Sequence, residues 1–419
     1  MELRNITKKE YTDFALKNPY ISIYQLSEWG ELKKTTGWIS HMVGLFDAGK
    51  LKGVSLLLQK KMPLGLNLFY SPRGFLLDVH DFDLLKEFTT LIKEYIKVHK
   101  GFMLKVDPNV IYATYDSEGE NQVLLGDDAF QNFQKLNYKH LGFTKNFETM
   151  QPRYLCRFKL LDTYDETLQT FSKTTRKNIE KTEQMGVRTR CVDEKEIDLF
   201  VSLLEETGKN KNFAIRPVSY YKKMYELMSD YIKLYISYID TDLYYKYIIT
   251  EIETTKKELD QINKQMQTMN VGNKLRTSKE QHDKKLESLM KSLKEAEEMK
   301  KVSDKISIGA LLSVFIGNEG ITFMSGTSNT YKNFNPKYAF YNEHIKECFK
   351  QKKEYCNFYG ISGDLNPNSK LYSLYEIKKG FKPEIIELIG EFDFITSKFK
   401  YNLYKIMLYV YQKTKKIKK

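Results

Sequence analysis

The chain has 419 residues, 41% of them hydrophobic, and a formal net charge of +13 at pH 7. This length allows two ordinary domains, and the excess of basic residues favours nucleic acid, anionic lipid or phosphorylated molecules as partners. The four cysteines form no CxxC pair, the first residues lack the apolar core of a signal peptide, and no stretch approaches the roughly 18 apolar residues of a membrane span. These features exclude a disulfide scaffold and an integral membrane protein, and we expect a cytoplasmic location.

Two halves of the chain repeat one order of predicted elements. In the first half, strands at residues 41–46, 53–59 and 67–70 precede a helix near 82–99 and a strand at 102–106. In the second half, strands at residues 231–239, 306–316 and 321–325 precede a helix at about 335–352 and a strand at 355–359. Each half therefore predicts a mixed sheet with helices packed on it. The order matches the acyl-CoA N-acetyltransferase fold, so the predicted class is α+β with two acetyltransferase-like (GNAT-type) domains.

Residues 244–303 interrupt the second copy and predict a long, charged helical hairpin. Apolar residues recur at three-, four- and seven-residue steps on both sides of a break at 270–273, as in a coiled-coil seam. The seam comprises Ile252, Leu259, Ile262, Met266 and Met269 on one helix and His282, Leu286, Leu289, Leu293 and Ala296 on the other. A partner-binding arm is one interpretation, and a solvated spacer or dimerisation device is the other. Because the seam packs mainly on itself, we expect that excision of residues 246–300 leaves a folded body.

The expected domain boundaries follow from this repeat. The first domain spans residues 1–150 and is completed by 396–419, the second spans 151–243 and 304–395, and the arm spans 244–303. Hairpin tips tolerate insertions of this kind because their ends already lie close together. No GxGxxG or Walker-type string occurs in the chain, so the fold does not bring a nucleotide cofactor with it.

Short strings spread along nearly the whole chain resemble those of the FemABX family. In order, they are YQLSEWGELK at 24–33, GW at 37–38, YSPRGFLLD at 70–78, KVDP at 105–108, QPR at 151–153, SK, RK and GV between 172 and 187, NFYG at 357–360, KKGF at 378–381 and IGEF at 389–392. Each string is weak alone, but the set in this order is specific. Members of the family are tRNA-dependent aminoacyltransferases that build the peptide cross-bridge of Gram-positive peptidoglycan, and some carry a coiled-coil hairpin like residues 244–303.

This resemblance implies transfer of an amino acid from aminoacyl-tRNA to an amine on the stem peptide of a muropeptide precursor, either lipid-linked or UDP-linked. It implies no cofactor, because members use no coenzyme A, and this agrees with the missing glycine-rich loop. Both substrates carry phosphates and so suit a basic protein. Two alternatives remain: a small-molecule N-acetyltransferase on the same fold, and a non-catalytic tRNA- or partner-binding module.

The resemblance also implies a set of substrate-binding residues. Lys33 and Arg216 match the family's basic pair for the precursor's phosphates, and these residue types are the usual ligands of a pyrophosphate. Tyr220 follows Arg216 by one helical turn, and Trp38 is expected in the same groove. Without the resemblance, Lys33 would be interpreted as a solvated surface charge and Trp38 as core.

Two further residues carry the predicted chemistry. Lys378 matches a functionally important lysine of the family, and a cation there would stabilise the negative charge that develops on the ester during attack. Asp107 matches a buried acid that could orient or deprotonate the attacking ammonium. A helix-end lysine and an Asp-Pro turn are the simpler interpretations. Phe102, Phe323 and Ser325 stand where a relative has tyrosines, so we expect the precursor to be gripped differently.

Basic segments complete the predicted site. Lys173, Arg176, Lys177 and Lys181 recur at three- and four-residue steps along a predicted helix, which gives either a stripe for the tRNA backbone or a solvated face. The tail at 398–419 predicts a basic amphipathic helix that could make a peripheral contact with the inner leaflet of the plasma membrane, or touch tRNA. No metal site is expected, because the six histidines are scattered and none is paired with Cys or Asp at ligand spacing.

Overall fold

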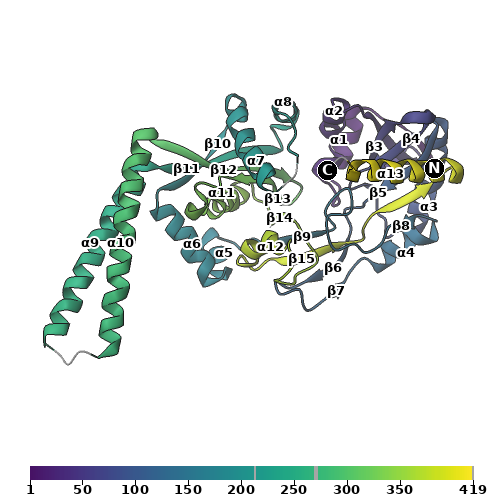
Figure 1. The fold of residues 1–419 in the computed structure, drawn as a ribbon. Helices are drawn as coiled ribbons and strands as arrows, with labels where there is room; N and C mark the ends of the chain where they lie inside the picture. Colours follow the sequence, from purple (N-terminus) through teal and green to yellow (C-terminus); the bar gives the residue numbers. More distant parts are fainter. Residues whose placement is uncertain (212–213, 269–271, 418–419) are drawn as a thin grey trace.

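The structure, a computed structural model, describes residues 1–211, 214–268 and 272–417 and contains two mixed β-sheets (Figure 1). The first sheet has the strand order β1-β2-β3-β4-β5-β16-β8. Its strands are β1 (Glu2–Asn5), β2 (Ile39–Asp47), β3 (Lys50–Lys61), β4 (Asn67–Ser71), β5 (Gly101–Val106), β8 (Lys139–His140) and β16 (Phe392–Ile395). The helices beside it are α1 (Lys8–Ala15), α2 (Ser27–Lys34), α3 (Phe82–Val98), α4 (Asp127–Lys135) and α13 (Lys398–Ile417).

The second sheet has the strand order β10-β11-β12-β13-β14-β9-β15-β6-β7. Its strands are β6 (Ile111–Tyr115), β7 (Val123–Leu124), β9 (Tyr154–Lys159), β10 (Val187–Val192), β11 (Ile232–Asp240), β12 (Lys305–Ile316), β13 (Glu319–Thr327), β14 (Tyr355–Ile361) and β15 (Glu384–Leu388). The helices beside it are α5 (Tyr164–Thr170), α6 (Lys173–Gln184), α7 (Ile197–Lys211), α8 (Val218–Met228), α11 (Pro336–Lys350) and α12 (Ser373–Lys379).

The two sheets repeat one topology. In the first sheet, β1–β2, β2–β3 and β3–β4 are antiparallel pairs and β4–β5 is a parallel pair. In the second sheet, β10–β11, β11–β12 and β12–β13 are antiparallel pairs and β13–β14 is a parallel pair. Helix α3 connects the first parallel pair and α11 the second, as a parallel connection requires. On α3, Leu85, Phe88, Ile92 and Ile96 are buried, and this three- and four-residue spacing places one apolar face on the sheet. The predicted α+β class with two mixed sheets and an inserted helical pair is confirmed.

The sheets do not divide at residue 150. Strands β6 and β7 lie before that position, yet they pair in the second sheet through β15. Strand β16 lies before residue 396, yet it pairs with β5 and β8 of the first sheet. Strands from the first part of the chain therefore pair in the second sheet, and a strand from the last part pairs in the first sheet. The expected domain boundaries stay a prediction.

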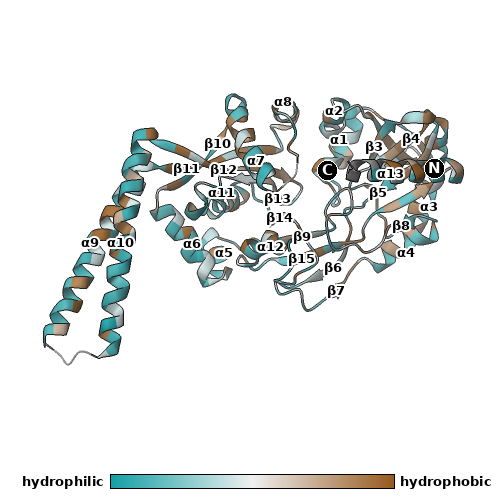
Figure 2. Ribbon diagram, viewed as in Figure 1, coloured by the Kyte–Doolittle hydropathy of each residue, from teal (hydrophilic) through white to brown (hydrophobic). Residues whose placement is uncertain are grey.

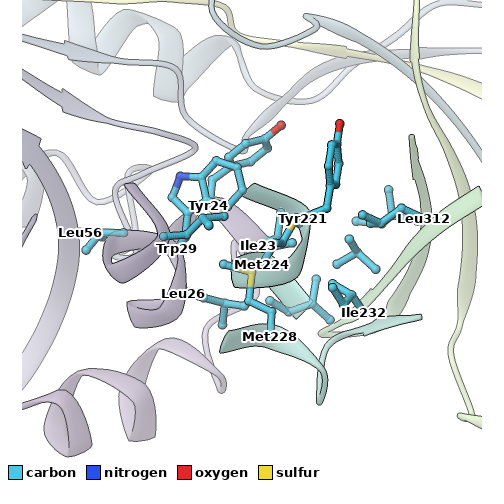
Figure 3. Packing of buried hydrophobic residues seen from close by; sticks show 14 of the residues in the cluster. Ile23, Tyr24, Leu26, Trp29, Leu56, Tyr221, Met224, Met228, Ile232 and Leu312 are labelled. Carbon is cyan, nitrogen blue, oxygen red and sulfur yellow. The ribbon is translucent and has the colours of Figure 1, made fainter. Parts of the chain in front are cut away.

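An apolar cluster joins the two sheets. Leu26 and Trp29 from the first half share it with Tyr221, Met224 and Met228 of α8, and Figure 3 shows these side chains facing one another. Helices α2 and α8 are in direct contact. This packing sets the position of one half relative to the other.

The arm consists of α9 (Thr241–Thr268) and α10 (Asn273–Val302), which extend away from the body side by side (Figure 1). Of the predicted seam, Ile252, Leu259, Ile262 and Ala296 are buried, Met266, His282, Leu286, Leu289 and Leu293 are half-buried, and Met269 lies outside the described residues with Asn270 and Val271 of the break. In hydropathy the arm is mostly polar outside this seam (Figure 2). No helix in the described part of the chain is long and apolar enough to cross a membrane.

The base of the arm is part of the body. Ile248, Ile252 and Met299 share a buried cluster with Val187 of β10 and Ile308 of β12. The expectation that the arm packs mainly on itself is therefore wrong for its base, because those side chains complete the core beside the second sheet.

Truncation of the arm tests this division. Replacing residues 256–285 by a short turn should leave the melting temperature within a few degrees of wild type, since it removes only the self-packed part. Excising residues 246–300 should cost several kcal/mol of unfolding free energy, because each buried Ile or Met removed costs roughly 2–5 kcal/mol. Thermal unfolding followed by circular dichroism compares the two deletions, and equal stability would contradict the assignment of the base to the body.

Candidate functional site

The predicted basic pair comes together across the two halves. Lys33 lies in the last turn of α2, and Arg216 lies in the segment just before α8. The Lys33 Nζ is 4.7 Å from the centre of the Trp29 ring and 5.9 Å from that of Tyr220. The Arg216 guanidinium is 5.7 Å from the same Tyr220 ring. The Tyr220 ring thus lies near both cations.

The electrostatics of this pair favour an anion. Burial, together with the charge of Arg216, lowers the pKa of Lys33 to about 8. Among the described residues, no carboxylate forms an ion pair with Lys33 or Arg216. Lys33 is half-buried and Arg216 is exposed. The two like charges repel each other, and a phosphate between them would relieve that repulsion.

Trp38 follows Lys33 closely in the chain, and its contacts are those of a packing residue. Its amide donates a hydrogen bond to the Lys33 carbonyl at 3.2 Å, and its half-buried ring packs on the cluster that joins the sheets. The Lys60 Nζ is 5.5 Å from the ring centre. Trp38 lines neither of the two cavities described below.

A groove opens where β13 and β14 diverge. The two strands pair only through Glu319–Ile321 and Tyr355–Asn357, whereas β13 continues to Thr327 and β14 to Ile361. A cavity of about 350 Å³ occupies the gap. Its walls include Thr322, Phe323 and Ser325 of β13, Phe358 and Tyr359 of β14, and Lys378 of α12.

Lys378 is fixed at the wall of this groove. Its Nζ donates hydrogen bonds to the Phe358 carbonyl at 2.7 Å and the Gly360 carbonyl at 2.9 Å. Both carbonyls belong to the part of β14 that has left β13. The ammonium is thus held at a defined place in the groove, unlike a solvated helix-end charge.

Asp107 is buried directly after β5, with 3% of its surface exposed. Its Oδ1 accepts a hydrogen bond from the Arg73 amide at 3.0 Å, and its Oδ2 lies 3.8 Å from the Arg73 guanidinium. Burial outweighs the attraction of Arg73 and raises the pKa of Asp107 to about 6. Oδ2 finds no hydrogen-bond partner within the described residues.

A second cavity lies between the two sheets, and sequence reasoning missed its key residues. It has a volume of about 310 Å³, and its walls include Arg73, Tyr24, Arg157 and Asn357. The Tyr24 hydroxyl, from the first half, lies 2.7 Å from the Tyr359 hydroxyl of β14. Tyr359 and Phe323 line this cavity and the groove alike, so the two spaces share a wall. The strings at 70–78 and 357–360 contain Arg73 and Tyr359, but nothing in the sequence places them opposite each other.

The three positions at which a relative has tyrosines do not lie together in the structure. Phe323 and Ser325 line the groove. Phe102 is fully buried, and its ring centre lies 5.3 Å from that of Tyr404 in α13. Phe102 therefore anchors the C-terminal helix and takes no part in the groove.

The basic stripe lies on α6 as expected. Lys173, Lys177 and Lys181 are exposed, while Thr175, Ile179 and Thr182 form the buried face of the helix. Arg176 is half-buried and donates a hydrogen bond to Gln169. Because α6 contacts α9 at the base of the arm, the stripe and the arm lie on the same side of the body.

The comparisons with known proteins agree over nearly the whole chain. The model of the FemAB family matches residues 6–408. Aminoacyltransferase FemA of Staphylococcus epidermidis is 28% identical over 412 residues, which are 97% of this chain and 99% of that protein. The lipid II:glycine glycyltransferase of the same species is 27% identical over 408 residues, with 96% and 95% covered. The crystal structure of FemX superposes with a TM-score of 0.76 at 26% identity and covers 96% of this chain and 99% of its own.

The fold and site define an acyltransferase built from two mixed sheets, and the chain belongs to the FemAB family. This membership confirms the predicted resemblance and the predicted aminoacyltransferase activity in peptidoglycan synthesis. It disfavours the N-acetyltransferase and the non-catalytic binding module.

The raised pKa of Asp107 predicts a pH dependence of stability. Folded Asp107 keeps its proton up to about pH 6, whereas its ordinary pKa is 3.8. Between these values the native state binds more protons than the unfolded state, so stability falls as pH rises through the window. Relative to Asp107→Asn, wild type should lose roughly 2–3 kcal/mol of unfolding free energy between about pH 4 and about pH 7. Urea unfolding across this range measures the difference, and parallel profiles for the two proteins would refute it.

Proposed function

We propose that this aminoacyltransferase moves an amino acid from aminoacyl-tRNA to an amine on the stem peptide of a lipid-linked muropeptide precursor. One arrangement supports the proposal: the basic pair Lys33 and Arg216 lies at the junction of the two halves, and a groove holding the fixed Lys378 ammonium lies in the second half. The 27% identity to a lipid II:glycine glycyltransferase supports a lipid-linked acceptor.

The reaction assigns a role to the groove. The neutral amine attacks the carbonyl carbon of the aminoacyl ester and a C–N bond forms. The C–O bond to the tRNA ribose breaks, and the leaving oxygen becomes a hydroxyl by taking up the proton that the nitrogen loses. Negative charge develops first on the carbonyl oxygen and then on the leaving oxygen. Lys378 stabilises this charge, since its ammonium is already held at the wall by two carbonyls and needs no reorganisation.

The acceptor approaches through the cavity between the sheets. Arg73, Tyr24 and Tyr359 line that cavity, and the shared wall brings an amine held there next to the groove. Asp107 does not line either space, so its contacts favour a positioning role, in which it holds Arg73 at the cavity wall. Direct proton transfer from the attacking ammonium to Asp107 would need the carboxylate to reach the cavity.

The donor tRNA binds along α6 and the arm. Lys173, Lys177 and Lys181 present exposed charges on the side of the body from which the arm extends. A tRNA that contacts both α6 and the arm would place its acceptor end at the nearby groove. Basic residues spaced along one face suit a phosphodiester backbone.

Helix α13 brings the enzyme to the inner face of the plasma membrane. Its inner side packs through Tyr401, Tyr404 and Met407 on the cluster around Phe102. Its outer side exposes Phe399, Ile406 and Val410 by 79%, 61% and 54%, and the helix contains lysines but no acidic residue. An apolar stripe framed by lysines suits an anionic bilayer surface. Of the expected tail, the side chains at 411, 412 and 414–419 lie outside the described residues.

Vesicle binding tests the membrane contact. The double variant Phe399→Glu and Ile406→Glu should co-sediment at least ten-fold more weakly with anionic vesicles than wild type, because two apolar side chains no longer enter the bilayer surface. Val302→Glu is the matched control, since Val302 is 77% exposed and ends α10 where the arm rejoins the body. Equal loss in both variants, or no loss in either, would argue against α13 as the contact.

Steady-state kinetics with charged tRNA and a labelled precursor test the function itself. Lys378→Met should lower kcat by about 30- to 1,000-fold with little change in the KM for precursor, since it removes charge stabilisation worth roughly 2–4 kcal/mol in the transition state. Lys33→Met and Arg216→Met should instead raise the KM for precursor, because phosphate contacts exist before and during the reaction.

The neighbouring lysine supplies the control. Lys379 forms an ion pair with Glu118 at 2.6 Å, outside the groove, so Lys379→Met should keep near-normal kcat and KM. If wild type transfers no label from any aminoacyl-tRNA to the precursor, the proposed substrates are wrong. If Lys378→Met keeps near-normal turnover, its assigned role is wrong.

A further inference from the structure

A buried cluster of metal-ligating side chains lies apart from the groove. His344 and Cys348 stand four residues apart on α11, and Cys356 lies near the start of β14. All three side chains are fully buried, and their ligand atoms lie within 4.8 Å of one another. The expectation of no histidine at ligand spacing from a cysteine is therefore wrong, because a four-residue step places both on one helix face.

The distances suit a thiolate–imidazole site. The His344 Nε2 lies 3.5 Å from the Cys348 Sγ. A Zn–N bond of about 2.0 Å and a Zn–S bond of about 2.3 Å at a tetrahedral angle place the two donors about 3.5 Å apart. The pair is thus already spaced as two ligands of one ion would be.

Two residues beside the cluster, Ser313 and Gly320, favour metal binding. The His344 Nδ1 lies 2.9 Å from the buried Ser313 hydroxyl. This contact fixes the ring with Nε2 toward the sulfurs, as outer partners of metal-binding histidines do. Gly320 makes room for the thiol, because a Cβ at that position would overlap the Cys348 Sγ.

We propose that His344, Cys348 and Cys356 supply three protein ligands of a Zn²⁺ site that joins α11 to β14. Two thiolates and a neutral imidazole cancel the charge of a divalent ion, and a neutral site is the kind that an apolar core tolerates. Thiolate and imidazole ligands favour zinc among abundant divalent ions. Since the donors are buried, the ion enters as α11 packs on the sheet, and its binding free energy adds to folding.

A metal at this site would also fix the position of β14 at the wall of the groove. Phe358, two residues after Cys356 on the same strand, gives a carbonyl to Lys378. A metal that fixes the start of β14 to α11 therefore fixes the strand on which Lys378 rests. The proposal does not depend on the identity of the substrates.

Metal analysis of the purified full chain tests the site. Elemental analysis should find about one zinc per chain in wild type and in Cys191→Ser, whose thiol lies on β10 outside the cluster. Cys348→Ser and Cys356→Ser should lose it. Ser313→Ala should keep the ligands but bind zinc about 10-fold more weakly.

Cobalt substitution keeps the test independent of variants that fail to fold. Wild type refolded without zinc and titrated with Co²⁺ should develop thiolate-to-cobalt absorption that saturates at about one equivalent. Wild type that holds neither zinc nor cobalt would overturn the proposal and leave a thiol–imidazole hydrogen bond in the core. Copper in place of zinc, or a Cys348–Cys356 disulfide found by peptide mapping, would also overturn it.

Discussion

The packing of α2 against α8 is the contact on which the rest of the site depends. Leu26 and Trp29 meet Met224 and Met228 in one apolar cluster (Figure 3), and burial of four such side chains stabilises the junction by several kcal/mol. This offsets the repulsion between Lys33 and the nearby Arg216, which alone would push the two halves apart. Two like charges thus lie close together because apolar contacts beneath them hold the two halves in place.

The groove arises from one structural difference between the two copies of the repeat. In the first copy, β4 and β5 stay paired along Asn67–Ser71 and Gly101–Val106, so their backbone groups satisfy each other. In the second copy, β13 leaves β14 after three residue pairs, which frees backbone groups that must find other partners. The Lys378 ammonium takes two of these carbonyls. The opening that makes the groove therefore also supplies the bonds that hold its cation.

Local patterns predicted most of the fold, and long-range pairing accounts for what they missed. The hairpin strands, α3, α11 and both arm helices follow from period-two and three-to-four spacing, and the predicted ranges lie within a few residues of those observed. The insertion of β16 between β5 and β8, and of β15 between β9 and β6, leaves no mark on local periodicity. The same holds for the site: Lys33, Arg216 and Lys378 came from the family resemblance, whereas Tyr359 opposite Tyr24, and Cys356 beside His344, depend on strands and helices far apart in the chain.

Apolar packing also holds the other groups of basic residues in place. Lys33 and Arg216 lie at the junction, the lysines of α6 lie beside the arm, and those of α13 frame an apolar stripe. At each place a buried apolar face fixes the backbone, so the cations of each group stay close together. Charges held in this way attract phosphates over about a Debye length, roughly 8–10 Å at physiological salt. In the proposed function each phosphate-bearing substrate meets its own group of cations, and apolar packing fixes the distances between those groups, so that both substrates can reach one groove.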